Sequence, residues 1–179
     1  ADFVAQQKFG GFQDYRGSGH FSVRLTVALV AARVIAKKLL KNISITATLI
    51  EAGGEKNIED GLAKAIKAKD SIGGIAACTI HGLPAGLGEP FFDSAESLIA
   101  HLAFAIPAIK GIEFGAGFSA AKMFGSEHND VIENASGKTK TNHAGGINGG
   151  ITNGNDLVFR VAIKPTSSTP QTQETWNSK

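Results

Sequence analysis

The sequence predicts an α+β fold in which strands and helices pack as the layers of a sandwich. Segments with the two-residue period of a strand alternate with segments of helical period along most of the chain. The links between them are rich in glycine, and no G-x-G-x-x-G sequence follows a predicted strand, which argues against a dinucleotide-binding parallel sheet. One long helix is apolar on nearly every face, so it requires cover on more than one side.

This long helix is expected over residues 22–41, a stretch without Gly or Pro. Ser22 is its expected N-cap, and Lys37, Lys38 and Lys41 lie where cations favour the negative end of the helix dipole. We expect the helix to be buried inside the layered structure.

The remaining elements follow from local periodicity. A helix that begins near residue 93 is predicted from Asp93 and Glu96, which resemble a capping box, and Pro107 ends it. Strands are predicted where apolar and polar residues alternate, and helices where apolar residues recur every three to four positions. The other expected elements are a strand at 43–49, an amphipathic helix at 58–69, and strands within 71–81, 109–114 and 157–163.

Composition narrows the class of protein. Of the 179 residues, 42% are hydrophobic and 19% are charged, which is typical of a globular protein, and we expect a single domain over residues 1–179. The 18 basic and 16 acidic residues are scattered, so the sequence favours no nucleic-acid partner. The single Cys78 excludes an internal disulfide and fits a reducing compartment. No apolar segment has the length of a membrane span and Ala1 opens no signal peptide, so a cytoplasmic location without membrane attachment is expected.

The stretch TNHAGGINGGITNG at residues 141–154, hereafter the glycine loop, exposes its backbone to a ligand. Two glycine pairs, Gly145–Gly146 and Gly149–Gly150, flank Ile147 and Asn148. Glycine permits positive φ and lets a ligand approach main-chain N–H groups without meeting a Cβ atom. Turns and linkers share this composition, so the pattern alone is weak.

A second polar segment follows the strand at 157–163. Lys164, Pro165, Thr166, Ser167 and Ser168, hereafter the hydroxyl strap, combine an ammonium group with three hydroxyls on a chain stiffened by proline. This combination suits a phosphate or another anion. From these residues alone, an ordinary surface turn is the favoured interpretation.

Taken together, these stretches resemble the chorismate synthase family in the order of its motifs. The motifs are KFGGFQDYRGSGHFS, GLPAGLGEPFFDS, GSEHND, TNHAGGINGGITNG and VFRVAIKPTSS, and the similarity covers nearly the whole chain through Ser168. The resemblance implies a β-α-β sandwich, with antiparallel sheets enclosing a helical layer, and a homotetramer.

The resemblance also implies an activity. This is the conversion of 5-enolpyruvylshikimate 3-phosphate to chorismate and phosphate, a 1,4-anti-elimination at the seventh step of the shikimate pathway that requires reduced FMN. The protein must bind two anions face to face, exclude water and steer protons.

The resemblance assigns cofactor-binding residues one by one. From the residues alone, the triplet at 20–22 is a helix cap and the pair at 107–108 is a helix stop. The implied FMN-binding residues are His20, Phe21, Ser22, Pro107, Ala108, Gly149, Lys164, Pro165, Thr166, Ser167 and Ser168. Supporting roles are expected for Arg24, Asn142, His143 and His128, although Asn142 and His143 fit an Asx turn equally well.

No catalytic residue is predicted within this chain, because the histidines and the acid that the family uses for proton transfer fall outside its motifs. No metal is expected either: Glu127, His128 and Asp130 have no second ligand pair at suitable spacing. The chain starts at Ala1 and its only methionine is Met123, so we expect it to lack its natural amino terminus.

Two further expectations concern the whole chain. Residues 50–70 look shorter than the family's corresponding region, which predicts that the chain skips a loop there. We also expect the chain alone to keep the flavin scaffold without turnover. The alternative functions are a non-catalytic flavin-binding module and a structural assembly module.

Overall fold

The computed structural model describes residues 2–14 and 16–175. Its α-helices are α1 (Asp2–Phe9), α2 (Val27–Leu39), α3 (Ile58–Ala68), α4 (Ala95–Phe104) and α5 (Gly125–His128). Its strands are β1 (Ser44–Ala52), β2 (Gly74–His81), β3 (Ile109–Phe114), β4 (Ile147–Asn148), β5 (Ile151–Thr152) and β6 (Leu157–Ile163). Short 3-10 helices add η1 (Arg16–Phe21), η2 (Val23–Thr26), η3 (Phe91–Asp93) and η4 (Gly117–Lys122).

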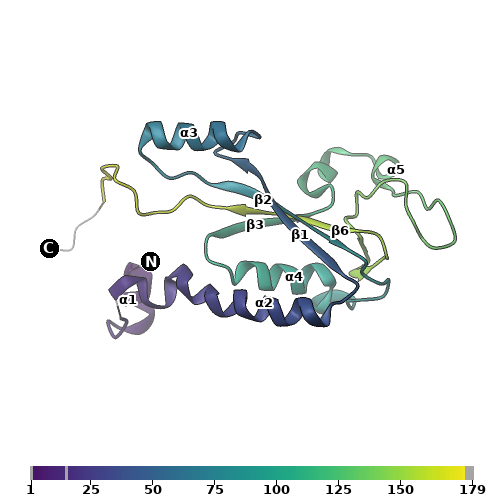
Figure 1. Cartoon of the computed structure of the whole chain (residues 1–179), viewed down its shortest axis with the longest axis horizontal. Coiled ribbons are helices and arrows are strands. Elements are labelled where there is room, and N and C mark those ends of the chain that lie inside the picture. Colours follow the sequence, from purple (N-terminus) through teal and green to yellow (C-terminus); the bar gives the residue numbers. More distant parts are fainter. Residues whose placement is uncertain (1, 15, 176–179) are drawn as a thin grey trace.

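One antiparallel sheet organises the molecule. Its strand order is β1-β2-β6-β3, and β4 and β5 form a separate two-stranded hairpin. In the view of Figure 1, α3 lies above this sheet, and α4 and α2 lie below it. The order places β6, the strand nearest the carboxyl end, between β2 and β3. The segments that enter and leave β6 lie at opposite ends of the sheet.

The strand predicted at 157–163 is confirmed as β6, and its first residues show where the core forms. Leu157 is fully buried, and Phe159 lies beside Phe114 with 5.7 Å between the ring centroids. Leu157 packs with Ile147 of the hairpin and Ala95 of α4. The core therefore sits at the end of the sheet where α4, the hairpin and β6 all begin.

The expected helix at 58–69 is confirmed as α3, with Asn57 as its N-cap and Lys69 in the left-handed conformation at its end. The predicted start of α4 was wrong by one residue. Ser94 is the N-cap, because its hydroxyl accepts a hydrogen bond from the Ser97 amide at 3.1 Å, whereas Asp93 belongs to the preceding 3-10 helix. Ser94 also has the extended backbone that an N-cap requires.

The predicted burial of the long helix was wrong for this chain. Residues 22–41 form η2 followed by α2, and Ser22 caps the 3-10 helix rather than α2. No residue of α2 is buried, and the side chains of Val27, Ile35 and Leu39 are 70%, 65% and 77% exposed. The described residues supply no layer on the outer side of α2, so its apolar faces lie open.

The α+β class with antiparallel strands is confirmed. Of the expected sandwich, the described part of the chain contains one four-stranded sheet and the helical layer; it holds no second sheet of that size beyond the helices. That residues 1–179 form a single domain stays a prediction. We find no described helix that combines the length and the apolarity needed to span a bilayer.

Candidate functional site

The glycine loop folds into the β4–β5 hairpin. Gly149 and Gly150 form its two-residue turn with φ of +59° and +85°, as a type I′ turn requires. A Cβ atom on Gly149 would meet nothing within 4 Å, whereas Gly150 packs against Ser94. The Gly150 carbonyl accepts a hydrogen bond from the Ala95 amide at 2.8 Å. The tip of the hairpin therefore rests on the amino end of α4 and leaves Gly149 open.

The Asn142 side chain closes the base of the loop. Its Oδ1 accepts from the Gly146 amide at 2.8 Å, and its Nδ2 donates to the Asp156 carbonyl at 2.8 Å. Both ends of the amide are thus used inside the loop. This geometry supports the loop-stabilising interpretation of Asn142.

Asp130 holds the start of the loop from outside. Its Oδ1 accepts from the Thr141 hydroxyl at 2.6 Å and from the His143 amide at 2.8 Å, and its Oδ2 accepts from the Ala144 amide at 2.9 Å. Burial raises the pKa of this carboxyl, but the hydrogen bonds outweigh it and hold the pKa below its usual value. Asp130 therefore stays ionised at neutral pH.

The hydroxyl strap is attached mainly through its backbone. The Lys164 amide donates to the Ala108 carbonyl at 2.9 Å, and the Ser71 hydroxyl donates to the Thr166 carbonyl at 2.6 Å. The side chains from Lys164 to Ser168 are exposed, and the strap hydroxyls have no partner among the described residues. A hollow of about 400 Å³ beside Thr166 and Ser168 reaches Lys69 at the end of α3.

Ala108 joins two of the predicted motifs. Its hydrogen bond to Lys164 places the Pro107–Ala108 pair directly against the hydroxyl strap. Its φ is +75°, a left-handed conformation that non-glycine residues rarely adopt and that is often found where the backbone serves a ligand.

The triplet His20, Phe21 and Ser22 lies apart from the glycine loop and from the hydroxyl strap. His20 and Phe21 are exposed and line a hollow of about 100 Å³ together with Phe9 and Phe12. The Ser22 hydroxyl accepts from the amide and the Nε of Arg24 at 3.3 and 3.0 Å. Ser22 thus acts as a helix cap here, with Arg24 folded onto it.

The predicted residues form separate groups within one chain. Pro107, Ala108 and the hydroxyl strap lie at the carboxyl end of α4, whereas Gly149 lies at its amino end. Ten helical residues span about 15 Å, so these groups are well separated. Neither the hollow beside the hydroxyl strap nor the one beside His20 includes Gly149.

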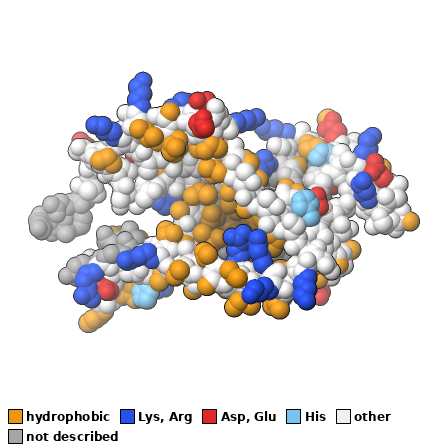
Figure 2. Space-filling view, in the orientation of Figure 1, with side chains coloured by type: hydrophobic (Ala, Val, Ile, Leu, Met, Phe, Trp, Pro, Cys, Tyr) orange, Lys and Arg blue, Asp and Glu red, His pale blue; other side chains and the backbone are white. Residues whose placement is uncertain are grey.

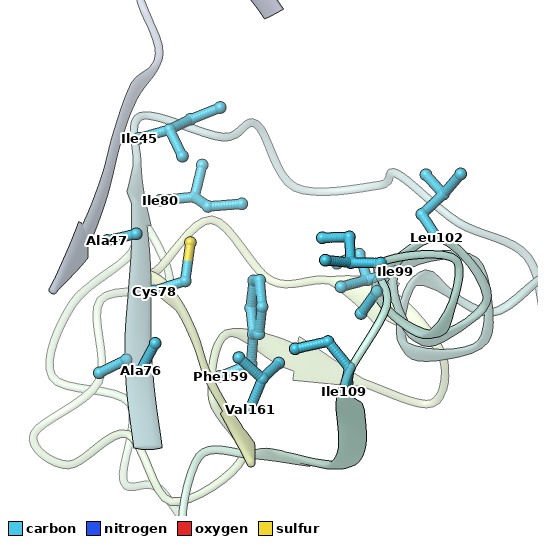
Figure 3. Close-up of a pocket in the computed structure, with 13 residues that line it drawn as sticks. Ile45, Ala47, Ala76, Cys78, Ile80, Ile99, Leu102, Ile109, Phe159 and Val161 are labelled. Atoms are coloured by element: carbon cyan, nitrogen blue, oxygen red, sulfur yellow. The ribbon is translucent and has the colours of Figure 1, made fainter. Parts of the chain in front are cut away.

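An apolar hollow of about 350 Å³ opens between the sheet and α4. Figure 3 shows Phe159 and Cys78 projecting from the sheet toward Ile99 of α4, and no charged side chain lines the space. Burial raises the pKa of the Cys78 thiol. Figure 2 shows hydrophobic side chains gathered in the middle of this face, between α3 and α2. This hollow has the character of a core with part of its cover absent.

Sequence reasoning missed several polar contacts at the edges of the sheet. It weighed Asp130 only as a metal ligand and missed its contacts with the glycine loop, which span 11 to 14 residues along the chain. It also missed the pair between His81 Nδ1 and Asp156 Oδ1 at 2.8 Å. It also left out the Arg160–Glu113 pair between neighbouring strands, at 2.9 Å. An acid shortly before the glycine loop was the available signal for Asp130. Among the described residues no group of three or more His, Cys, Asp or Glu side chains could hold a metal ion.

A comparison with protein families identifies the family of this chain. The chorismate synthase family model matches residues 1–179. The chain belongs to the chorismate synthase family. A chorismate synthase of Chitinophaga pinensis is 69% identical over 180 residues and covers 100% of this chain and 54% of that protein. A chorismate synthase of Korarchaeum cryptofilum is 42% identical and covers 98% of this chain and 57% of that protein.

The fold agrees with this family. A crystal structure of a chorismate synthase superimposes with a TM-score of 0.82 at 27% identity, and the match covers 93% of this chain and 62% of that one. The chain thus spans a little over half the length of the curated relatives that it matches.

The alignment lengths also bear on the expected missing loop. Alignments to the Korarchaeum and Cytophaga hutchinsonii proteins run over 206 and 211 positions, against 180 for the Chitinophaga protein. The chain is therefore shorter than the Korarchaeum and Cytophaga proteins over the matched region, and it shares this length with the Chitinophaga relative. That the difference falls at residues 50–70 stays a prediction.

Proposed function

We propose that the whole protein is a chorismate synthase, a carbon–oxygen lyase that converts 5-enolpyruvylshikimate 3-phosphate to chorismate and phosphate by 1,4-anti-elimination. The family match over all 179 residues is the observation that carries this proposal. The relatives named above carry the same enzyme name, which favours an enzyme over a non-catalytic module.

The residues present fit reduced FMN as the cofactor. A flavin phosphate requires a cation and several donors. The hydroxyl strap offers the exposed Lys164 ammonium, which donates to the neighbouring Pro165 carbonyl, together with three hydroxyls that have no partner among the described residues. A flavin ring requires backbone that it can approach closely, which Gly149 and Ala108 provide. Reduced FMN, when bound, supplies an electron transiently and accepts the proton, with no net oxidation or reduction.

In the proposed reaction, the residues of this chain would bind and orient the flavin. Lys164 and the strap hydroxyls would hold the phosphate by charge-assisted hydrogen bonds, and the glycine loop would present its backbone toward the ring. The family's proton-transfer residues have no counterpart in these residues. We therefore propose that the chain by itself keeps much of the flavin scaffold and does not turn over.

The open apolar surfaces support a larger assembly. The exposed faces of α2 and the hollow beneath the sheet are apolar areas that water does not favour. We propose that the rest of the protein and neighbouring copies in a homotetramer cover them, and that the separated flavin loops are completed there. The proposed location is the cytoplasm.

Activity of the natural full-length protein tests the proposed function. We expect chorismate and phosphate to form in equal amounts from 5-enolpyruvylshikimate 3-phosphate under anaerobic conditions with reduced FMN, and not without it. A full-length protein that binds this substrate and reduced FMN without releasing phosphate would overturn the assignment. The 179-residue chain is the matched control and is expected to show no turnover.

A further inference from the structure

Asp130 is the most deeply embedded charge near the glycine loop. Its side chain is 6% exposed, and it receives three hydrogen bonds from residues 141–144, where the loop begins. A buried carboxylate is costly unless donors surround it, so these donors and Asp130 stabilise each other. No other described acid has a comparable set of backbone donors from this loop.

Asp130 also fixes His143, whose backbone amide donates to it. Its Nδ1 lies 3.2 Å from the His128 carbonyl and 3.5 Å from the Asp130 Oδ1. The rings of His128 and His143 are tilted by 33°, with centroids 5.8 Å apart. Both oxygens can only accept, so Nδ1 carries the proton and Nε2 of the neutral ring is an acceptor. The ring is 31% exposed, which leaves it accessible to a ligand.

Further hydrogen bonds fix the part of the loop that leads from residues 141–144 toward the hairpin. The His143 carbonyl accepts from the Ala116 amide at 2.8 Å, and Asn142 fixes Gly146, from which the hairpin starts. The tip itself is held by α4, since the Gly150 carbonyl beside Gly149 accepts from the Ala95 amide at 2.8 Å, so the contacts of Asp130 and Asn142 fix the base of the loop.

We propose that Asp130 is the positioning residue for the start of the glycine loop, which holds the His143 acceptor in place for a bound flavin. The binding part of this inference rests on the proposed function. The loop-holding part stands on the hydrogen bonds alone.

Asp130→Asn in the full-length protein tests the loop-holding part. The amide keeps one acceptor oxygen but turns an NH₂ group toward the Ala144 amide, so that hydrogen bond is lost. Hydrogen exchange measured by mass spectrometry is expected to be about tenfold faster in peptides covering residues 141–146. Exchange in β6 is expected to stay unchanged.

Asp156→Asn is the matched control. It removes the same charge close to the same loop, yet Asp156 contacts the loop only through its backbone carbonyl. Exchange at residues 141–146 is expected to stay at the wild-type rate in this variant. Equal rates in wild-type protein and Asp130→Asn, or equally fast exchange in both variants, would overturn the inference.

FMN titration of the same three proteins tests the binding part. We expect Asp130→Asn to raise the Kd for FMN about tenfold and Asp156→Asn to change it less than twofold. Faster exchange in Asp130→Asn with an unchanged Kd would overturn the binding part. A wild-type protein that takes up no FMN would instead refute the proposed function, and the exchange result would still decide whether Asp130 holds the loop.

Discussion

The glycine loop and the hydroxyl strap, the two proposed flavin-binding segments, are held in opposite ways. Asp130 and Asn142 use their side chains to fix the glycine loop, and the carbonyls of His143 and Gly150 tie it to its neighbours. The strap is attached through the Lys164 amide and the Thr166 carbonyl. Its three hydroxyls have no partner among the described residues, and the Lys164 ammonium donates to the neighbouring Pro165 carbonyl at 3.0 Å. The loop is therefore organised before any ligand arrives, whereas the strap keeps its polar side chains available for one.

Substitutions of two loop glycines should show the largest effect. In Gly146→Ala the new Cβ would lie 2.5 Å from the Asp156 carbonyl oxygen at φ of +83°, so we expect a loss of about 3 kcal/mol or more in the free energy of unfolding. Gly149→Ala meets no atom and suffers only the left-handed strain, about 1 kcal/mol. Urea denaturation measures both. Equal losses would show that the base of the loop is no more rigid than its tip.

Lowering the pH should destabilise the glycine loop but not the hydroxyl strap. The folded-state pKa of Asp130 is lowered, so its stabilisation is complete above its unfolded pKa of about 3.9 and is lost as pH falls through the folded pKa. At pH 7 we expect Asp130→Asn to be about 2 kcal/mol less stable than the wild-type protein.

This deficit should shrink as the pH falls below about 4, because protonation then removes the same charge from the wild-type protein. Urea unfolding at a series of pH values measures it. A deficit that is constant with pH would contradict the role given to the carboxylate.

Ala108 should show a smaller effect at the boundary between α4 and the strap. Ala108→Gly removes the left-handed strain but adds freedom to the unfolded chain, so we expect a gain of about 0.5 kcal/mol. Ala108→Val should lose about 2 kcal/mol, because a β-branched residue tolerates positive φ poorly. Thermal denaturation of both variants measures the difference, and a Val variant as stable as the Gly variant would argue against strain at this position.

The sequence predicted the regular elements well because their signals are local. The alternation at 109–114 and 157–163 and the helical period at 58–69 needed only neighbouring residues. The hairpin inside the glycine loop was not predicted, since its strands are only two residues long. The exposure of α2 was missed because an apolar pattern indicates that a helix needs cover but does not show which segment provides it.

The candidate site was predictable only in part. The joining of Ala108 to Lys164 and the hold of Asp130 on His143 depend on contacts between distant segments, which periodicity does not reveal. His20, Gly149 and Ser167, which the resemblance assigns to one cofactor, lie in separate places within one chain. Their roles in binding FMN stay predictions.

FMN titration of Lys164→Gln tests the central claim most directly, with Lys140→Gln as the control because Lys140 is an exposed lysine away from the strap. Both variants should keep the wild-type free energy of unfolding within about 0.5 kcal/mol. We predict that Lys164→Gln raises the Kd for FMN about tenfold or more, and that Lys140→Gln changes it less than twofold. An unchanged Kd in Lys164→Gln, or equal weakening in both variants, would contradict the proposal that the strap holds the flavin phosphate.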